Sequence, residues 1–165
     1  MEIDTDGRGQ VLAYGIKEPI KKGLTQKATI SEVHKQGGVA IIAHPFDIIR
    51  GMQEIKMNYK YADGLETLNF GAVCNTKAAK FAKYNGVKVC TAGSDAHTYL
   101  LLDSALLQIS KKCDTLDEFI NILKAGDFVI FRNKNQIWAL IVGGLNVFVT
   151  RLLWLLGVVK PRTAT

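Results

Sequence analysis

The chain has 165 residues, of which 48% are hydrophobic and 22% are charged. This length fits a single domain, and this apolar content is that of a packed core, which excludes an intrinsically disordered chain. The formal net charge of +6 at pH 7 favours anionic partners, such as ligands that carry phosphate, without naming one of them.

The cysteine content and the first residues bear on the cellular compartment. Cys74, Cys90 and Cys113 are an odd number of cysteines and form no CxxC pair, so neither a disulfide framework nor a zinc ribbon is indicated. The N-terminal sequence MEIDTDGRG is acidic and polar, whereas a secretory signal needs a basic stretch followed by an apolar one. We therefore expect a reducing, cytoplasmic location.

Short apolar runs rich in β-branched residues alternate with amphipathic stretches over most of the chain. This pattern is typical of βα units around a largely parallel sheet, so the sequence predicts an α/β fold. The expected strands are residues 11–16, 39–43, 64–69, 87–91, 104–109 and 127–131. The expected helices are residues 25–36, with Thr25 as N-cap, 76–84, and 116–124, with a cap at Asp114 or Thr115.

Residues 132–165 differ from the rest and form a basic and apolar C-terminal segment, predicted to be helical. Within it, residues 137–159 are almost entirely apolar and match the roughly 20 residues that span a bilayer. Arg151 lies inside this stretch, at a cost of about 2.5 to 3.5 kcal/mol for membrane insertion. Two interpretations stay open, namely a helix that packs on the domain or on a partner, and contact with a membrane.

Candidate functional side chains follow two of the predicted strands. His44 comes directly after the strand at residues 39–43, and Asp95 and His97 come after the strand at residues 87–91. Functional groups in parallel α/β folds gather where the strands end at their carboxyl side, so we expect these three side chains to meet at one rim. Imidazole and carboxylate ligands suit divalent Zn, Mn or Fe, so the sequence predicts a metal site there.

Each of these residues also has a purely structural interpretation. A lone histidine before proline is often a loop residue, and a lone aspartate such as Asp95 is often a helix cap, but their joint placement favours a site. Glu66 lies within the strand at residues 64–69, where it either points at the site or takes part in a buried structural pairing. His34 lies in the middle of a predicted helix, on a face that we expect to be solvated.

Four strings in this sequence resemble a known family. GQVLAYGI, IKKGLTQKATISEVHKQGGVAIIAHPFD, DGLETLN and TAGSDAHT resemble, in this order, the C-terminal two-thirds of a PHP domain, the polymerase and histidinol phosphatase family. The resemblance covers residues 1–131 and implies a partial, distorted (β/α)7 TIM-like barrel. It also implies hydrolysis of phosphoesters with two or three divalent metal ions.

The resemblance assigns roles to residues of this chain. Glu2 matches the metal-bridging glutamate of the family, and His44 matches the histidine of its HP motif. Asp95 and His97 match its terminal ligand pair, and we expect both of them to act in catalysis as well. The expected metal ligands are thus Glu2, His44, Asp95 and His97.

The sequence also departs from the family pattern. The HxH motif of the first family strand and a further TDH-type motif have no counterpart, because the chain begins at the glutamate motif. Gln10 stands where many relatives carry a histidine, and glutamine is a poor ligand for borderline metal ions. The absent first strands would leave sheet edges exposed, which favours a homo-oligomer or a partner chain.

Two function hypotheses follow. The first is a metal-dependent phosphoesterase, a hydrolase for a phosphorylated small molecule or nucleotide, impaired by the missing motifs. The second is a non-catalytic PHP-like scaffold that binds a metal, a nucleotide or a partner protein. Specific nucleic-acid binding is not expected, because the sequence has no RNP-type aromatic pattern, helix-turn-helix signature or arginine stripe. The expected location is cytoplasmic, with membrane association as the alternative if residues 137–159 contact lipid.

Overall fold

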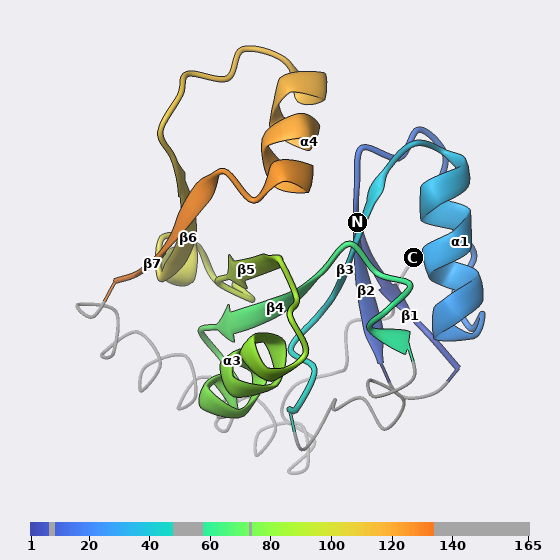
Figure 1. The fold of residues 1–165 in the computed structure, drawn as a ribbon, viewed down its shortest axis with the longest axis horizontal. Coiled ribbons are helices and arrows are strands. Elements are labelled where there is room, and N and C mark those ends of the chain that lie inside the picture. The colour runs from blue at the N-terminus through green and yellow to red at the C-terminus, as the bar shows by residue number, and fades with distance from the viewer. Residues whose placement is uncertain (7–8, 48–57, 73, 134–165) are drawn as a thin grey trace, which may run out of the picture.

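The computed structural model describes residues 1–6, 9–47, 58–72 and 74–133 (Figure 1). Seven strands lie in this part of the chain, namely β1 (Glu2–Asp4), β2 (Gln10–Tyr14), β3 (Val39–Ile42), β4 (Gly64–Asn69), β5 (Val89–Gly93), β6 (Ala105–Ile109) and β7 (Phe128–Arg132). The helices are α1 (Gln26–Lys35), α3 (Asn75–Tyr84), α4 (Leu116–Ala125) and the short 3-10 turn η1 (Tyr99–Leu101).

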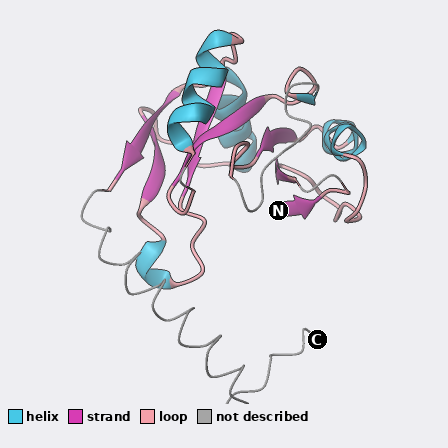
Figure 2. Cartoon of the chain, turned by 90° about the horizontal axis from the view of Figure 1, so that it is seen from below, coloured by secondary structure: helices cyan, strands magenta, loops and turns pink. Residues whose placement is uncertain are grey.

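The first five strands form one mixed sheet in the order β1-β2-β3-β4-β5. β2 is antiparallel to both β1 and β3, and Tyr14 at the end of β2 faces Val39 at the start of β3. β4 is parallel to both β3 and β5. β6 and β7, which are joined through α4, form a separate two-stranded antiparallel sheet beside β5 (Figure 2).

The expectation of a partial, distorted (β/α)7 TIM-like barrel of PHP type is wrong for the residues that the structure describes. A TIM barrel needs parallel neighbours all around, but β2 runs against both of its neighbours, and β6 and β7 pair only with each other. Residues 5–9 between β1 and β2 are also too few for the crossover of about a dozen or more residues that a parallel pair requires. The observed fold is a small mixed α/β arrangement without a closed barrel in the described part.

Local signals place the helices close to where the sequence predicts them. Thr25 caps α1, because its side chain accepts a hydrogen bond from the Ala28 backbone N–H at 3.2 Å. Thr115 and Glu118 form a capping box at the start of α4, in which each side chain accepts from the backbone of the other. Gly126 then ends α4 in the left-handed conformation at φ +74°.

The hydrophobic core lies on both faces of the mixed sheet. Successive residues of a strand point to opposite faces, so Val39 and Ile41 of β3 share one face, and Ala40 and Ile42 share the other. α4 and the β6–β7 sheet cover the first face through the cluster Val39, Ile41, Val89, Ile120 and Leu123, with Leu107 and Phe128 packed against it. α1 and α3 cover the second face through two clusters, one containing Val11, Ile30, Val33 and Ala40 and the other Ile42, Leu65 and Ala82.

Residues 137–159 lie outside the described residues. The packed helix and the membrane contact therefore both stay predictions. Within the described part of the chain, no helix is both long and apolar enough to cross a bilayer.

Candidate functional site

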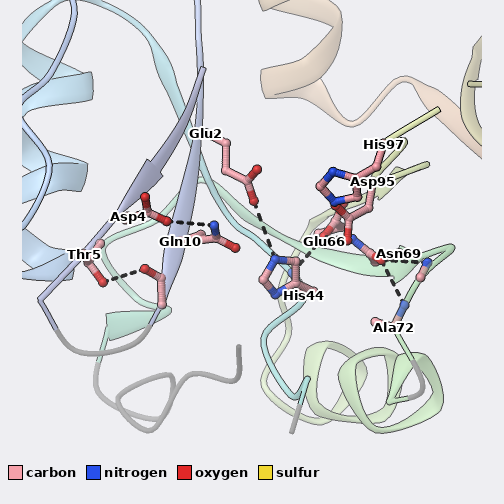
Figure 3. Close-up of polar contacts among 12 residues, drawn as sticks. Glu2, Asp4, Thr5, Gln10, His44, Glu66, Asn69, Ala72, Asp95 and His97 are labelled. Atoms are coloured by element: carbon pink, nitrogen blue, oxygen red, sulfur yellow. Dashed lines mark hydrogen bonds and ion pairs between the residues drawn. The ribbon is translucent and has the colours of Figure 1, made fainter. Parts of the chain in front are cut away.

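His44 lies two residues after the end of β3 and is buried at 3% exposure. Its backbone N–H donates a hydrogen bond of 2.8 Å to Oε2 of Glu66 on the neighbouring strand β4. Its ring atom Nε2 lies 3.6 Å from Oε1 of Glu2 on β1 (Figure 3). Glu2 and His44 therefore form one pair of a carboxylate and an imidazole.

Asp95 and His97 form a second such pair after β5. Nε2 of His97 lies 3.4 Å from Oδ1 of Asp95. The Asp95 side chain is only 11% exposed, whereas that of His97 is 80% exposed. The carboxylate is thus held within the fold, and the imidazole is open to a ligand from solvent.

Glu66 lies between the two pairs (Figure 3). Its Oε2 accepts a second hydrogen bond, of 3.1 Å, from Nδ2 of Asn69. The pairing of β4 with β5 shifts register between Glu66 and Leu68, a β-bulge of the kind that proteins place beside active sites.

The surroundings of Glu66 change the pKa of its carboxyl group. Burial raises the pKa of the Glu66 carboxyl, because the charged form loses water, and the negative charge of Asp95 acts in the same direction. The hydrogen bonds from His44 and Asn69 stabilise the charged form and oppose this rise in pKa. The raised pKa indicates that burial outweighs these bonds.

The backbone at the ends of β3 and β5 is unusual. Among the described residues, His44 with φ +25° and Asp95 with φ +49° are the non-glycine residues that have a positive φ. This conformation is uncommon for residues with a Cβ atom and persists only where the surrounding structure enforces it, which is frequent at functional sites. Both residues are expected ligands, and each belongs to a different pair.

Gln10 at the start of β2 also faces this region (Figure 3). Its Nε2 donates to Oδ1 of Asp4 at 2.9 Å, and Lys22 lies 3.0 Å from Oδ2 of the same carboxylate. The hydrogen bond from Lys22, followed by that from Gln10, lowers the pKa of Asp4. Oε1 of Gln10 is buried and has no hydrogen-bond partner within the described part of the chain.

The side chains of this region meet only part of the needs of a divalent ion. The donor types fit, because each pair supplies one carboxylate and one imidazole, and the buried amide oxygen of Gln10 adds a weaker donor. However, no group of three or more His, Cys, Asp or Glu side chains in the described ranges lies close enough to hold one ion. The sharing of ions by Glu2, His44, Asp95 and His97 therefore stays a prediction.

Sequence reasoning missed the part that Asn69 plays. Asn69 is buried at the end of β4, and its Oδ1 accepts bonds of 3.0 Å from the backbone N–H groups of Gly71 and Ala72. The available signal was a polar residue that ends an apolar strand beside a candidate site. Glu66 had two open interpretations, and the structure gives it a buried pairing that lies at the site.

His34 is exposed, as predicted, but it has an unpredicted partner. Its Nε2 lies 2.8 Å from Oδ2 of Asp63, and the same oxygen accepts a bond of 2.7 Å from the Ala40 backbone N–H on β3. His34 therefore joins α1 to the sheet near the start of β3, whereas His44 follows the end of that strand.

Comparison with known proteins gives a fold relationship only. No family model matches this chain, and no curated protein is detectably similar to it. Among solved structures, the crystal structure of PsfC from Pseudomonas syringae PB-5123 is similar, with a TM-score of 0.68 and 16% sequence identity. The similarity covers 92% of this chain but only 64% of the length of PsfC. This chain and that part of PsfC share a fold.

Proposed function

We propose that this chain is a metal-dependent phosphoesterase domain in which Glu2, His44, Asp95 and His97 hold divalent Zn, Mn or Fe. The observation that carries the proposal is the backbone at His44 and Asp95, because both residues keep a left-handed conformation beside a carboxylate and imidazole pair. Strain of this kind is retained where function needs a fixed side chain. The net charge of +6 supports a phosphorylated small molecule or nucleotide as substrate.

The two pairs have different roles in this proposal. The buried His44 and the half-exposed Glu2 belong to the more enclosed part of the site and would hold an ion. A bound divalent ion would neutralise phosphate charge and make hydroxide available from water near neutral pH. Asp95 and the solvent-exposed His97 would hold a second ion at the more open part of the site.

A second candidate is a non-catalytic scaffold that binds a metal ion, a nucleotide or a partner protein. Gln10 favours it, because its amide nitrogen is bonded to Asp4 and only the weakly ligating amide oxygen remains for an ion. In this case the two pairs bind an ion and a phosphate group without turnover.

One experiment with the purified full chain separates these candidates. Isothermal titration calorimetry with Mn²⁺ measures ion binding, and release of p-nitrophenol from p-nitrophenyl phosphate measures hydrolysis. The phosphoesterase proposal, in which the missing motifs impair activity, expects Mn²⁺ binding and slow hydrolysis in the wild type, and loss of that hydrolysis in His97→Ala. His34→Ala is the matched control, because it removes an exposed histidine that pairs with Asp63 away from the site, and it should keep both signals.

The outcomes point to different conclusions. Ion binding without hydrolysis supports the scaffold and overturns the phosphoesterase. Absence of Mn²⁺, Zn²⁺ and Fe²⁺ binding to the full chain overturns the metal site. Equal losses of hydrolysis in His97→Ala and His34→Ala overturn the assignment of His97.

A further inference from the structure

Glu66 is the carboxylate that lies between the two pairs (Figure 3), although the expected ligand set does not include it. Its side chain is buried at 3% exposure, and its Oε2 already accepts two hydrogen bonds, from the His44 backbone N–H and from the Asn69 amide. The other oxygen, Oε1, faces the backbone of Gly93 at the end of β5. The carboxylate is therefore surrounded by protein on both oxygens.

We propose that Glu66 is the positioning residue of this site, which holds His44 in its left-handed conformation and thereby fixes the imidazole beside Glu2. The proposal deepens the proposed function, and its metal-binding readout rests on that function.

The backbone conformation of His44 needs such a constraint. A residue with a Cβ atom at φ +25° leaves this region unless neighbouring contacts hold it, and Pro45 cannot contribute a backbone N–H to the loop. The hydrogen bond of 2.8 Å from His44 N–H to Glu66 ties the loop to β4 immediately after β3 ends. A charged acceptor makes this bond stronger than one between neutral groups.

Asn69 and Gly93 hold the carboxylate in turn. Asn69 donates to the same Oε2, and its own Oδ1 is occupied by the backbone of residues 71 and 72, so its amide cannot rotate freely. Gly93 leaves the space that Oε1 occupies, because a Cβ atom at this position would overlap that oxygen. Gly93 has no positive φ, so the space, and not the backbone conformation, requires glycine here.

This packing supplies two independent ways to disturb the carboxylate. Glu66→Ala removes it, and Gly93→Ala displaces it while Glu66 itself is unchanged. The displacement is tolerable for the fold, because the overlapping atom is the end of a flexible side chain. Glu66→Gln keeps an acceptor oxygen for His44 and tests whether a hydrogen bond, as distinct from a negative charge, is what the site needs.

The experiment measures the His44 backbone amide by ¹H–¹⁵N NMR without metal, and Mn²⁺ affinity by calorimetry, for each full-length variant. In Glu66→Ala and Gly93→Ala, we expect the His44 amide proton to shift upfield and to exchange faster with solvent. We also expect the Mn²⁺ dissociation constant to rise by about 10- to 100-fold in both, the usual loss when a group that orients a ligand is removed. Glu66→Gln should restore the amide signal and most of the affinity.

Two further variants make the test specific. Thr67→Val removes the adjacent β4 side-chain bond to the Thr91 carbonyl and should leave the His44 amide and the Mn²⁺ affinity unchanged. The double variant Glu66→Ala with Gly93→Ala should be no weaker than Glu66→Ala alone, because the overlap is with an atom that is already gone.

Each result decides the proposal. An unchanged His44 amide in both Glu66→Ala and Gly93→Ala overturns it. Loss of Mn²⁺ binding in Glu66→Gln with an unchanged His44 amide makes Glu66 a metal ligand and also overturns it. If the wild type binds no Mn²⁺ but the His44 amide responds as expected, the proposed function fails while the positioning role of Glu66 stands.

Discussion

The close approach of β4 and β5 at Gly64 is the part of the fold most sensitive to one added methyl group. Gly64 faces Val89 in the parallel register, and a Cβ atom at position 64 would overlap the Val89 carbonyl oxygen. It would also lie 2.8 Å from Cβ and 2.9 Å from Cγ1 of Val89. Gly64→Ala can therefore be accommodated only if the two strands separate, which weakens the ladder two residues before Glu66.

The expected size of this effect follows from two opposing contributions. Overpacking in a core costs about 1 to 3 kcal/mol, and the overlap with backbone places this case toward the upper end. Replacement of glycine by alanine stabilises by about 0.4 to 1 kcal/mol, because it reduces the freedom of the unfolded chain. We expect a net loss of about 2 kcal/mol in the free energy of unfolding, or a fall of about 4 to 8 °C in melting temperature.

Urea unfolding followed by circular dichroism measures this loss. Gly71→Ala is the matched control, because a Cβ atom there would meet its nearest neighbours at 3.5 Å, an ordinary contact. The control should stay within about 0.5 kcal/mol of the wild type, as is usual for substitutions without a specific clash. If Gly64→Ala is equally harmless, the reasoning about the β4–β5 spacing is refuted.

Three further predictions concern capping, pH and the α1 contact. Thr115→Ala should lower the free energy of unfolding by about 1 kcal/mol, since it removes one half of the capping box of α4, and urea unfolding would show it. Because burial raises the pKa of Glu66, the folded chain binds this proton more tightly than the unfolded chain, so the carboxyl makes folding less favourable as pH rises through its pKa. The unfolding free energy of Glu66→Gln should therefore increase relative to that of the wild type as pH rises from acidic to neutral. A difference in unfolding free energy that stays constant over this range would contradict the prediction. Asp63→Ala should cost more stability than His34→Ala, because Asp63 also accepts a β3 backbone N–H. Thermal unfolding of both variants measures the two losses, and equal losses would show that only the His34–Asp63 contact matters.

Local patterns in the sequence predicted the helices α1, α3 and α4 and the strands β2 to β7, but not β1, and the ends of β2 and β5 differ from the prediction by up to two residues. Thr25 and Thr115 mark the starts of α1 and α4, since a threonine hydroxyl is a local partner for the first free N–H groups of a helix. The strand predicted at residues 64–69 is β4 without a change of boundary. Such features depend on neighbours within a few residues, so they can be read from the chain alone.

Strand direction and the closing of the sheet were decided only by tertiary structure. The same alternation of strands and helices is compatible with a parallel barrel and with the observed mixed sheet, because periodicity records which residues are buried and not which way a neighbouring strand runs. The antiparallel register pairs Tyr14 with Val39, which are 25 positions apart in the sequence. No local signal encodes a contact over that separation. The predicted TIM-like barrel failed for this reason.

The residues of the candidate site could also be predicted from the sequence, but their arrangement could not. His44, Asp95 and His97 could be named from the sequence, because ligand-type residues follow apolar strands, and Glu2 came from the resemblance. The two pairs, the left-handed backbone at His44 and Asp95, and the hydrogen bonds of Glu66 arise only when the strands β1 to β5 form one sheet. Strand pairing over long sequence separations creates these contacts, so the chemistry of the residues was readable in advance while their geometry was not.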